Sequence, residues 1–182
     1  MFILAVGVLL WAFSHLMKRI TPQFRANLGE SNGKMVAAGL SLLAIVFMVV
    51  GYRSVEVVQL WNPPAFLKHI NNLLMLIAIY LFIIRYSRGV IRSKLRHPML
   101  AAVKTWALAH LLVNGDLASL VLFGGILAWA VVDMILINKT EPAWRRPTRG
   151  TVMSDVMFLI PAALLMGAIG MFHAFMGYPV FG

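Results

Sequence analysis

Six long apolar stretches constrain this chain of 182 residues more than any other feature. Each approaches or reaches the roughly 17 to 20 residues that an α-helix needs to cross a bilayer. The stretches run over residues 1–17, 36–52, 70–85, 98–114, 117–137 and 156–176. Hydrophobic residues make up 61% of the chain and charged residues 12%, whereas soluble domains average about 45–50% and 25%. We therefore predict an all-α, polytopic membrane bundle of six transmembrane helices, folded as a single domain over residues 1–182.

The charges in the loops between these stretches alternate. The first, third and fifth loops hold four basic residues each against one, no and two acids, whereas the second and fourth loops hold few charges. Short loops rich in lysine and arginine stay in the cytoplasm. The odd-numbered loops are therefore predicted to be cytoplasmic, which puts both termini on the outer side. The first stretch is expected to be a retained helix, because Lys18 and Arg19 follow its apolar run instead of preceding it.

Composition also excludes several classes of function. The net charge of +10 would suit nucleic acid, but it is confined to short loops, so we predict a lipid bilayer and no nucleic acid as the partner. The chain has no cysteine. Disulfides, thiolate metal ligands and covalently attached haem are therefore excluded.

Histidine inside a long apolar helix needs a reason, because burying an unpaired polar ring is costly. His110 has apolar neighbours on both sides, while His15 could instead reach towards the nearby cytoplasmic surface. The runs WAFSH and WALAH place Trp11 before His15 and Trp106 before His110, one helical turn apart on one face. This echo would fit an inverted repeat of two three-helix halves.

Imidazoles from two membrane helices can ligate a haem iron, and Trp11 and Trp106 could then flank the macrocycle. Ordinary packing is the alternative role for each tryptophan. The remaining histidines suit backbone pairing or the headgroup level, and they are His69, His97 and His173. Asp133, near the cytoplasmic end of the fifth stretch, is either a site residue or the partner of a nearby lysine or arginine.

The run RHPMLAAVKTWALAHLLVNGD resembles the signature region of the NnrU family of bacterial membrane proteins, and FSHLMKR in the first helix also fits. That family is associated with nitric oxide and nitrite respiration. It is similar to the plastid 15-cis-zeta-carotene isomerase, a membrane haem b protein that isomerises a carotenoid double bond. The resemblance implies the bacterial inner membrane, a small apolar or gaseous ligand, and haem b held by His15 and His110. It adds Trp11, Trp106 and Asn114 to the cofactor-binding residues.

One position departs from the isomerase. The isomerase has a cysteine three residues before its second haem ligand, and this chain has Ala107 there. A mechanism that uses this thiolate is excluded, so a haem-dependent isomerase activity stays an open question.

Depth in the membrane gives other pairings of ligands. At about 1.5 Å per residue, His15 lies roughly 7 Å to the cytoplasmic side of mid-span and His110 roughly 6 Å to the outer side. Two nitrogens on one iron lie only about 4 Å apart. Depth alone would pair His69 with His110, or His97 with His15, and the resemblance favours His15 with His110.

The alternatives to a haem protein are a non-haem transporter that uses Asp133 and His110, and a membrane accessory or assembly protein with structural histidines.

Overall fold

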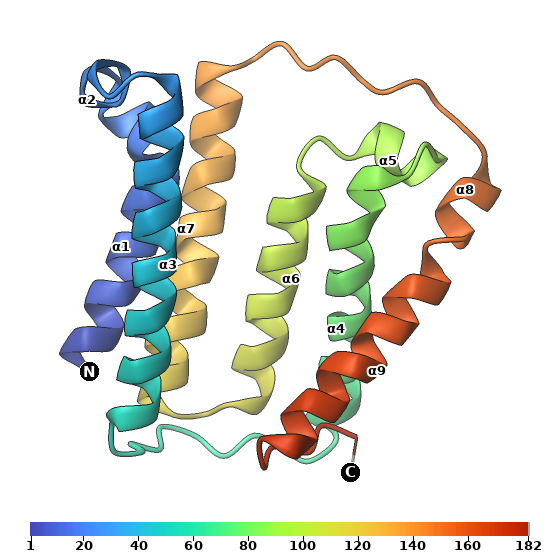
Figure 1. The fold of residues 1–182 in the computed structure, drawn as a ribbon. Helices are drawn as coiled ribbons and strands as arrows, with labels where there is room; N and C mark the ends of the chain where they lie inside the picture. The colour runs from blue at the N-terminus through green and yellow to red at the C-terminus, as the bar shows by residue number, and fades with distance from the viewer. Residues whose placement is uncertain (182) are drawn as a thin grey trace. The chain divides into compact units, whose positions relative to one another are not determined.

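The computed structural model describes residues 1–181, and its regular structure there is helical apart from one isolated β-bridge (Figure 1). The helices, in chain order, are α1 (Phe2–Ile20), α2 (Pro22–Asn27), α3 (Glu30–Ser54), α4 (Leu67–Ile83), the 3-10 helix η1 (Ile84–Tyr86), α5 (Val90–Lys94), α6 (Pro98–Val113), α7 (Leu117–Thr140), α8 (Val152–Val156) and α9 (Leu159–Phe175). The predicted all-α class is confirmed.

Among residues 1–181, five helical segments are long and apolar enough to cross a membrane. They are Phe2–Ile20, Glu30–Ser54, Leu67–Tyr86, Leu117–Thr140 and Val152–Phe175. The chain is therefore a multi-pass membrane protein. The remaining apolar helix, α6, has 16 residues. It is about 24 Å long, against a hydrocarbon core of about 30 Å.

Helix boundaries differ from the apolar stretches where polar residues continue a helix. α3 begins at Glu30, six residues before the predicted start of the second span at Val36. Lys34 Nζ lies 2.7 Å from Glu30 Oε1, an ion pair four residues apart that supports this first turn. The short helices α2, α5 and α8 were not predicted, because hydropathy marks apolar residues and not every helical one.

The chain divides into two compact units that interleave in sequence. Unit 1 comprises Met1–Asn62 with Asn114–Pro142, and unit 2 comprises Pro63–Val113 with the residues from Ala143 onward. Unit 1 holds the long helices α1, α3 and α7, and unit 2 holds α4, α6 and α9. These units do not coincide with two sequential three-helix halves, and the inverted repeat stays a prediction. Each unit contains one helix with a Trp-x-x-x-His run.

In unit 1, both α3 and α7 pack against α1 (Figure 1). Gly51 of α3 faces α1 so closely that a Cβ there would overlap the backbone of Leu4. Small residues permit such close helix contacts in membrane proteins. Arg19, at the C-terminal end of α1, lies 3.3 Å from Glu141, which follows α7. α1 and α7 therefore run in the same direction, and their basic ends lie together.

The segment Asn114-Gly115-Asp116 joins α6 to α7, and its Asp116 forms an isolated antiparallel bridge with Gln59 instead of the predicted tight turn. The Gly115 carbonyl accepts hydrogen bonds from the Leu60 and Trp61 N–H groups, at 2.7 and 3.0 Å. Asp116 caps α7 through a 2.8 Å bond from the Ser119 N–H. An aspartate at this position pairs a backbone donor that the helix itself leaves unpaired.

In unit 2, α6 and α9 both pack against α4 (Figure 1). Arg85, just after α4, donates a hydrogen bond to the sulfur of Met99 at the start of α6, so these helices are antiparallel. Asn72 near the start of α4 donates to the Val180 carbonyl, at 3.0 Å. The segment that follows α9 therefore lies beside the start of α4.

Candidate functional site

His15 is held by its own helix. Its Nδ1 atom lies 2.9 Å from the Trp11 carbonyl oxygen and 3.0 Å from Ser14 Oγ. A carbonyl oxygen can only accept, so Nδ1 donates the proton and Nε2 is the nitrogen that carries the lone pair. Metal-binding histidines commonly hold their second nitrogen on a carbonyl in this way. The local geometry therefore presents His15 in the tautomer that a metal requires.

Two tryptophans surround the His15 ring. Trp11 lies 4.2 Å away between ring centroids, and Trp129 of α7 meets the imidazole edge-on at 4.8 Å. Trp129 is only 7% exposed and crosses Trp11 at 86°, with 5.5 Å between the ring centroids. We call Trp11, His15 and Trp129 the aromatic cluster. The contact of Trp129 with His15 could not be predicted from the sequence, because nothing in a lone tryptophan on the fifth span indicates which helix it faces.

The aromatic cluster contains two indole donors without acceptors. Nε1 of Trp11 and Nε1 of Trp129 are both buried, and neither has a hydrogen-bond partner among the described residues. A buried unpaired donor costs about 1–3 kcal/mol, so two of them beside one imidazole call for an explanation. A ligand with acceptor oxygens would fit this surrounding.

An ion pair lies one helical turn along from the cluster. Arg19 follows His15 by four residues, and Asp133 follows Trp129 by four residues. Arg19 Nη1 lies 3.4 Å from Asp133 Oδ1, and Asp133 is 7% exposed. Of the two roles considered for Asp133, the structure therefore supports that of an ion-pair partner.

His110 repeats the His15 arrangement in unit 2. Its Nδ1 atom lies 3.0 Å from the Trp106 carbonyl oxygen, and the two rings are 5.0 Å apart between centroids. The same reasoning gives the Nδ1–H tautomer, with the lone pair on Nε2. His110 is half-buried.

Two other histidines lie at the same end of unit 2 as His110. His173 of α9 holds its Nδ1 atom 2.8 Å from the Ile169 carbonyl. His69 is the third residue of α4 and is exposed. His97 precedes α6 and lies at the opposite end of this helix from His110. Within residues 1–181, no group of three or more histidine or acidic side chains is arranged to hold a metal ion.

The candidate residues belong to both units. Trp11 and His15 are in contact in unit 1, and Trp106 and His110 are in contact in unit 2. Asn114 lies in the segment before α7. The start of α7 at Leu117 is about 18 Å along the helix from Trp129, so Asn114 is far from the aromatic cluster.

These features define a polytopic membrane protein in which two helices each hold a histidine on the carbonyl of a preceding tryptophan. The chain matches the family model described as NnrU protein over residues 3–180. It belongs to the NnrU family. Searches of the curated proteins and of the solved structures found no match.

Proposed function

We propose that this NnrU-family protein binds haem b in the membrane, with His15 and His110 as the axial ligands. The observation that carries the proposal is the shared arrangement of the two imidazoles. Each has its Nδ1 atom within 3.0 Å of the carbonyl of a tryptophan one turn earlier. This hydrogen bond fixes the ring and raises the basicity of the other nitrogen.

The surroundings of His15 fit such a cofactor. Haem b has carboxylate groups that accept hydrogen bonds, and the buried Nε1 donors of Trp11 and Trp129 have no acceptor among residues 1–181. Aromatic faces also suit the flat macrocycle. A bound haem b would supply a redox-active iron, and a small ligand would reach that iron only by displacing one of the two histidines.

Two serine hydroxyl groups extend the polar contacts of the His15 imidazole. Ser14 Oγ lies 3.0 Å from His15 Nδ1 and 2.9 Å from Ser41 Oγ on α3. Ser14 is 4% exposed, so water is kept from this face of the imidazole. These residues would hold the His15 ring and its proton in place.

The proposed setting is the bacterial inner membrane, with α6 as a sixth span and both termini on the outer side. A small apolar or gaseous ligand, and a role in nitric oxide or nitrite respiration, fit the family resemblance. An isomerase activity would have to proceed without a thiolate, because Ala107 is fully buried and occupies that position.

Topology can be tested directly, because the chain has no natural cysteine. Cysteine replaces either the exposed Lys139, after the fifth predicted span, or the exposed Tyr178, near the C-terminus. An impermeant maleimide should label Tyr178→Cys in intact cells and Lys139→Cys only after the membrane is opened. The reverse pattern would contradict the proposed orientation.

The test of haem binding is the visible spectrum of the purified protein in its oxidised and reduced forms, with a pyridine haemochrome assay. The proposal predicts a Soret band and one haem b per chain. A colourless protein, purified from cells supplied with haem precursor, would contradict it.

The two alternatives predict other results. A non-haem transporter predicts no haem spectrum and no spectral response to the loss of either histidine. Asp133, which this alternative would use, is paired with Arg19. An accessory protein with structural histidines predicts that His15→Ala and His110→Ala fold and function normally.

A further inference from the structure

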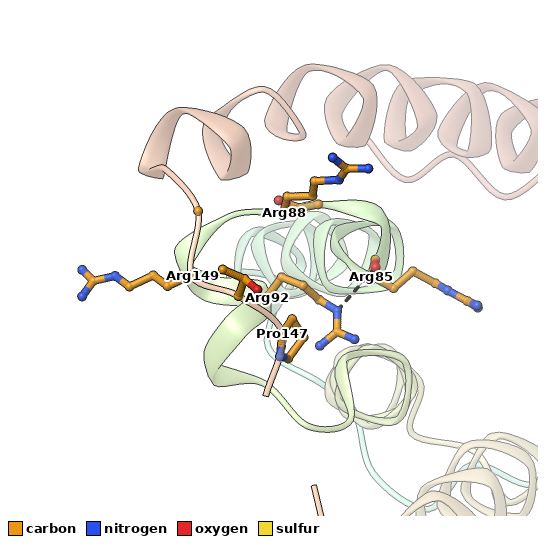
Figure 2. A pocket seen from close by; sticks show the side chains of 8 residues that line it. Arg85, Arg88, Arg92, Pro147 and Arg149 are labelled. Atoms are coloured by element: carbon orange, nitrogen blue, oxygen red, sulfur yellow. Dashed lines mark hydrogen bonds between the residues drawn. The ribbon is translucent and has the colours of Figure 1, made fainter. Parts of the chain in front are cut away.

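A pocket of about 550 Å³ lies at one end of unit 2 (Figure 2). It is formed by the turn that follows α4 and by the extended segment that precedes α8. Four arginines line it, and they are Arg85, Arg88, Arg92 and Arg149. We call this the arginine pocket. It is separate from every histidine discussed above, and nothing in the proposed haem site requires it.

A buried carboxylate fixes the first wall of the arginine pocket. Asp155 is 2% exposed, and its Oδ1 atom accepts a 2.9 Å hydrogen bond from Ser87 Oγ. Its Oδ2 atom accepts a 2.8 Å bond from the Ile91 N–H. Gly89 packs directly on this carboxylate, and a Cβ at Gly89 would overlap it. The turn after α4 is therefore held in one conformation.

Close backbone packing fixes the second wall. A Cβ at Gly150 would overlap the Arg88 carbonyl oxygen, so the segment before α8 lies directly against the turn after α4. Thr148 and Pro147 continue this wall. The pocket is therefore formed by two loops whose backbones are in direct contact.

The arginines of the pocket lack acidic partners. Among the described residues, none of the four guanidinium groups forms a salt bridge with a carboxylate. Asp155 belongs to this wall, but both of its oxygens already accept hydrogen bonds. Four arginines and one aspartate leave a local charge of 4 − 1 = +3. Like charges gathered at one place favour the binding of an anion.

The arginines are arranged around the rim. Arg92 lies beside Pro147 and donates to the Arg85 carbonyl at 3.4 Å, as the dashed line in Figure 2 shows. In the same view, the guanidinium groups of Arg85, Arg88 and Arg149 extend outward in different directions. Arg88 and Arg149 are exposed, so their heads can turn towards a ligand, as side chains at binding sites commonly do.

The position of the pocket indicates the source of the anion. Its walls join the ends of Leu67–Tyr86 and Val152–Phe175, two segments that can cross a membrane. The adjacent Tyr86, Val152 and Met153 are 68%, 64% and 63% exposed. Apolar surface of this kind suits acyl chains, and the ends of membrane-spanning segments are expected at the level of the headgroups. Guanidinium groups bind phosphate oxygens in pairs, and basic pockets at this level bind anionic lipids.

We propose that the arginine pocket binds the phosphate group of an anionic phospholipid headgroup. The test is native mass spectrometry of the full chain in micelles that contain equal amounts of phosphatidylglycerol and phosphatidylcholine. The wild type should retain phosphatidylglycerol preferentially. Arg88→Gln/Arg149→Gln should lower this preference about 25-fold, because each of the two guanidinium groups would lose a charge-assisted contact with the phosphate that contributes about fivefold. Circular dichroism checks that the variant is folded.

Two further variants separate the pocket from overall charge. Lys18→Gln/Lys139→Gln removes the same charge from exposed positions in unit 1 and should retain the preference. Gly150→Ala changes no charge but places a Cβ on the Arg88 carbonyl, so it should weaken lipid retention. Equal loss in the lysine variant, or full retention in the double arginine variant, would overturn the proposal. Complete displacement of the lipid by millimolar inorganic phosphate would also overturn it, in favour of a free-phosphate site.

Discussion

The two Trp-x-x-x-His helices have the same local structure and different neighbours. In both, the histidine Nδ1 atom lies on the carbonyl of the preceding tryptophan, at 2.9 Å for His15 and 3.0 Å for His110. In unit 1, α7 adds Trp129 to the His15 ring. In unit 2, the ring beside His110 is Trp106 of its own helix, and His173 of α9 lies at the same end of the unit.

This difference shows that the short motif and the packing of the third helix determine different properties of the histidine. The four-residue spacing alone gives the histidine its orientation and tautomer, because both partners lie on one helix. The third helix of each unit then decides what surrounds the ring. His15 lies in a tight aromatic setting with two unpaired indole donors, whereas the ring beside His110 is Trp106, which is half-buried.

Removal of the added tryptophan should have the largest effect on stability. Trp129→Ala should lower the free energy of unfolding by about 3–5 kcal/mol, because a buried aromatic side chain leaves a cavity. Trp106 of unit 2 is only half-buried, so Trp106→Ala should cost about half as much. The measurement is unfolding in mixed micelles with increasing sodium dodecyl sulfate. Equal losses would show that the two settings do not differ in packing.

The ion pair beside the aromatic cluster gives the next effect. Asp133→Ala should destabilise the protein by about 3 kcal/mol, because it leaves the largely buried Arg19 with only the exposed Glu141 as its acidic partner. The double variant Arg19→Met/Asp133→Ala should recover most of this loss, since no unpaired charge remains. The same unfolding titration measures both. A double variant no more stable than Asp133→Ala would show that the charge pair is not the cause.

The hydroxyl group beside His15 should have the smallest effect. Ser14→Ala removes the contacts with His15 Nδ1 and Ser41 Oγ and should cost about 1 kcal/mol. Thr105→Val in α6 is the matched control, because its hydroxyl bonds only to the Ala101 carbonyl of the same helix, at 3.0 Å. That variant should change stability by less than about 0.5 kcal/mol. If Thr105→Val lowers the free energy of unfolding as much as Ser14→Ala does, the contacts of Ser14 with His15 and Ser41 add no stability.

Much of the fold follows from the sequence. Apolar length locates the long helices, because a membrane span must bury all of its backbone hydrogen bonds within itself. The Asp116 cap also follows, since it depends on neighbouring residues. The pairing of α7 with α1 and α3 does not follow, because it depends on side-chain packing between distant segments, such as Trp129 on His15.

The candidate site was predictable to a similar degree. The spacing of Trp11 to His15 and of Trp106 to His110 is enough to predict that each pair shares a helix face. It gives no sign of Trp129, of the Arg19–Asp133 pair or of the arginine pocket. Arg88 and Arg149 are 61 positions apart in sequence, and their loops are brought together by the packing of Gly150 on the Arg88 carbonyl and by the hydrogen bonds of Asp155.

The central claim is that the two tryptophan-anchored histidines bind one haem b. Haem content per chain, measured by pyridine haemochrome in alanine variants of all five histidines, tests it most directly. We predict that His15→Ala and His110→Ala each lose the haem, while His69→Ala, His97→Ala and His173→Ala retain it. Retention of haem by His15→Ala together with its loss in His69→Ala or His173→Ala would contradict the claim and place the ligands within unit 2.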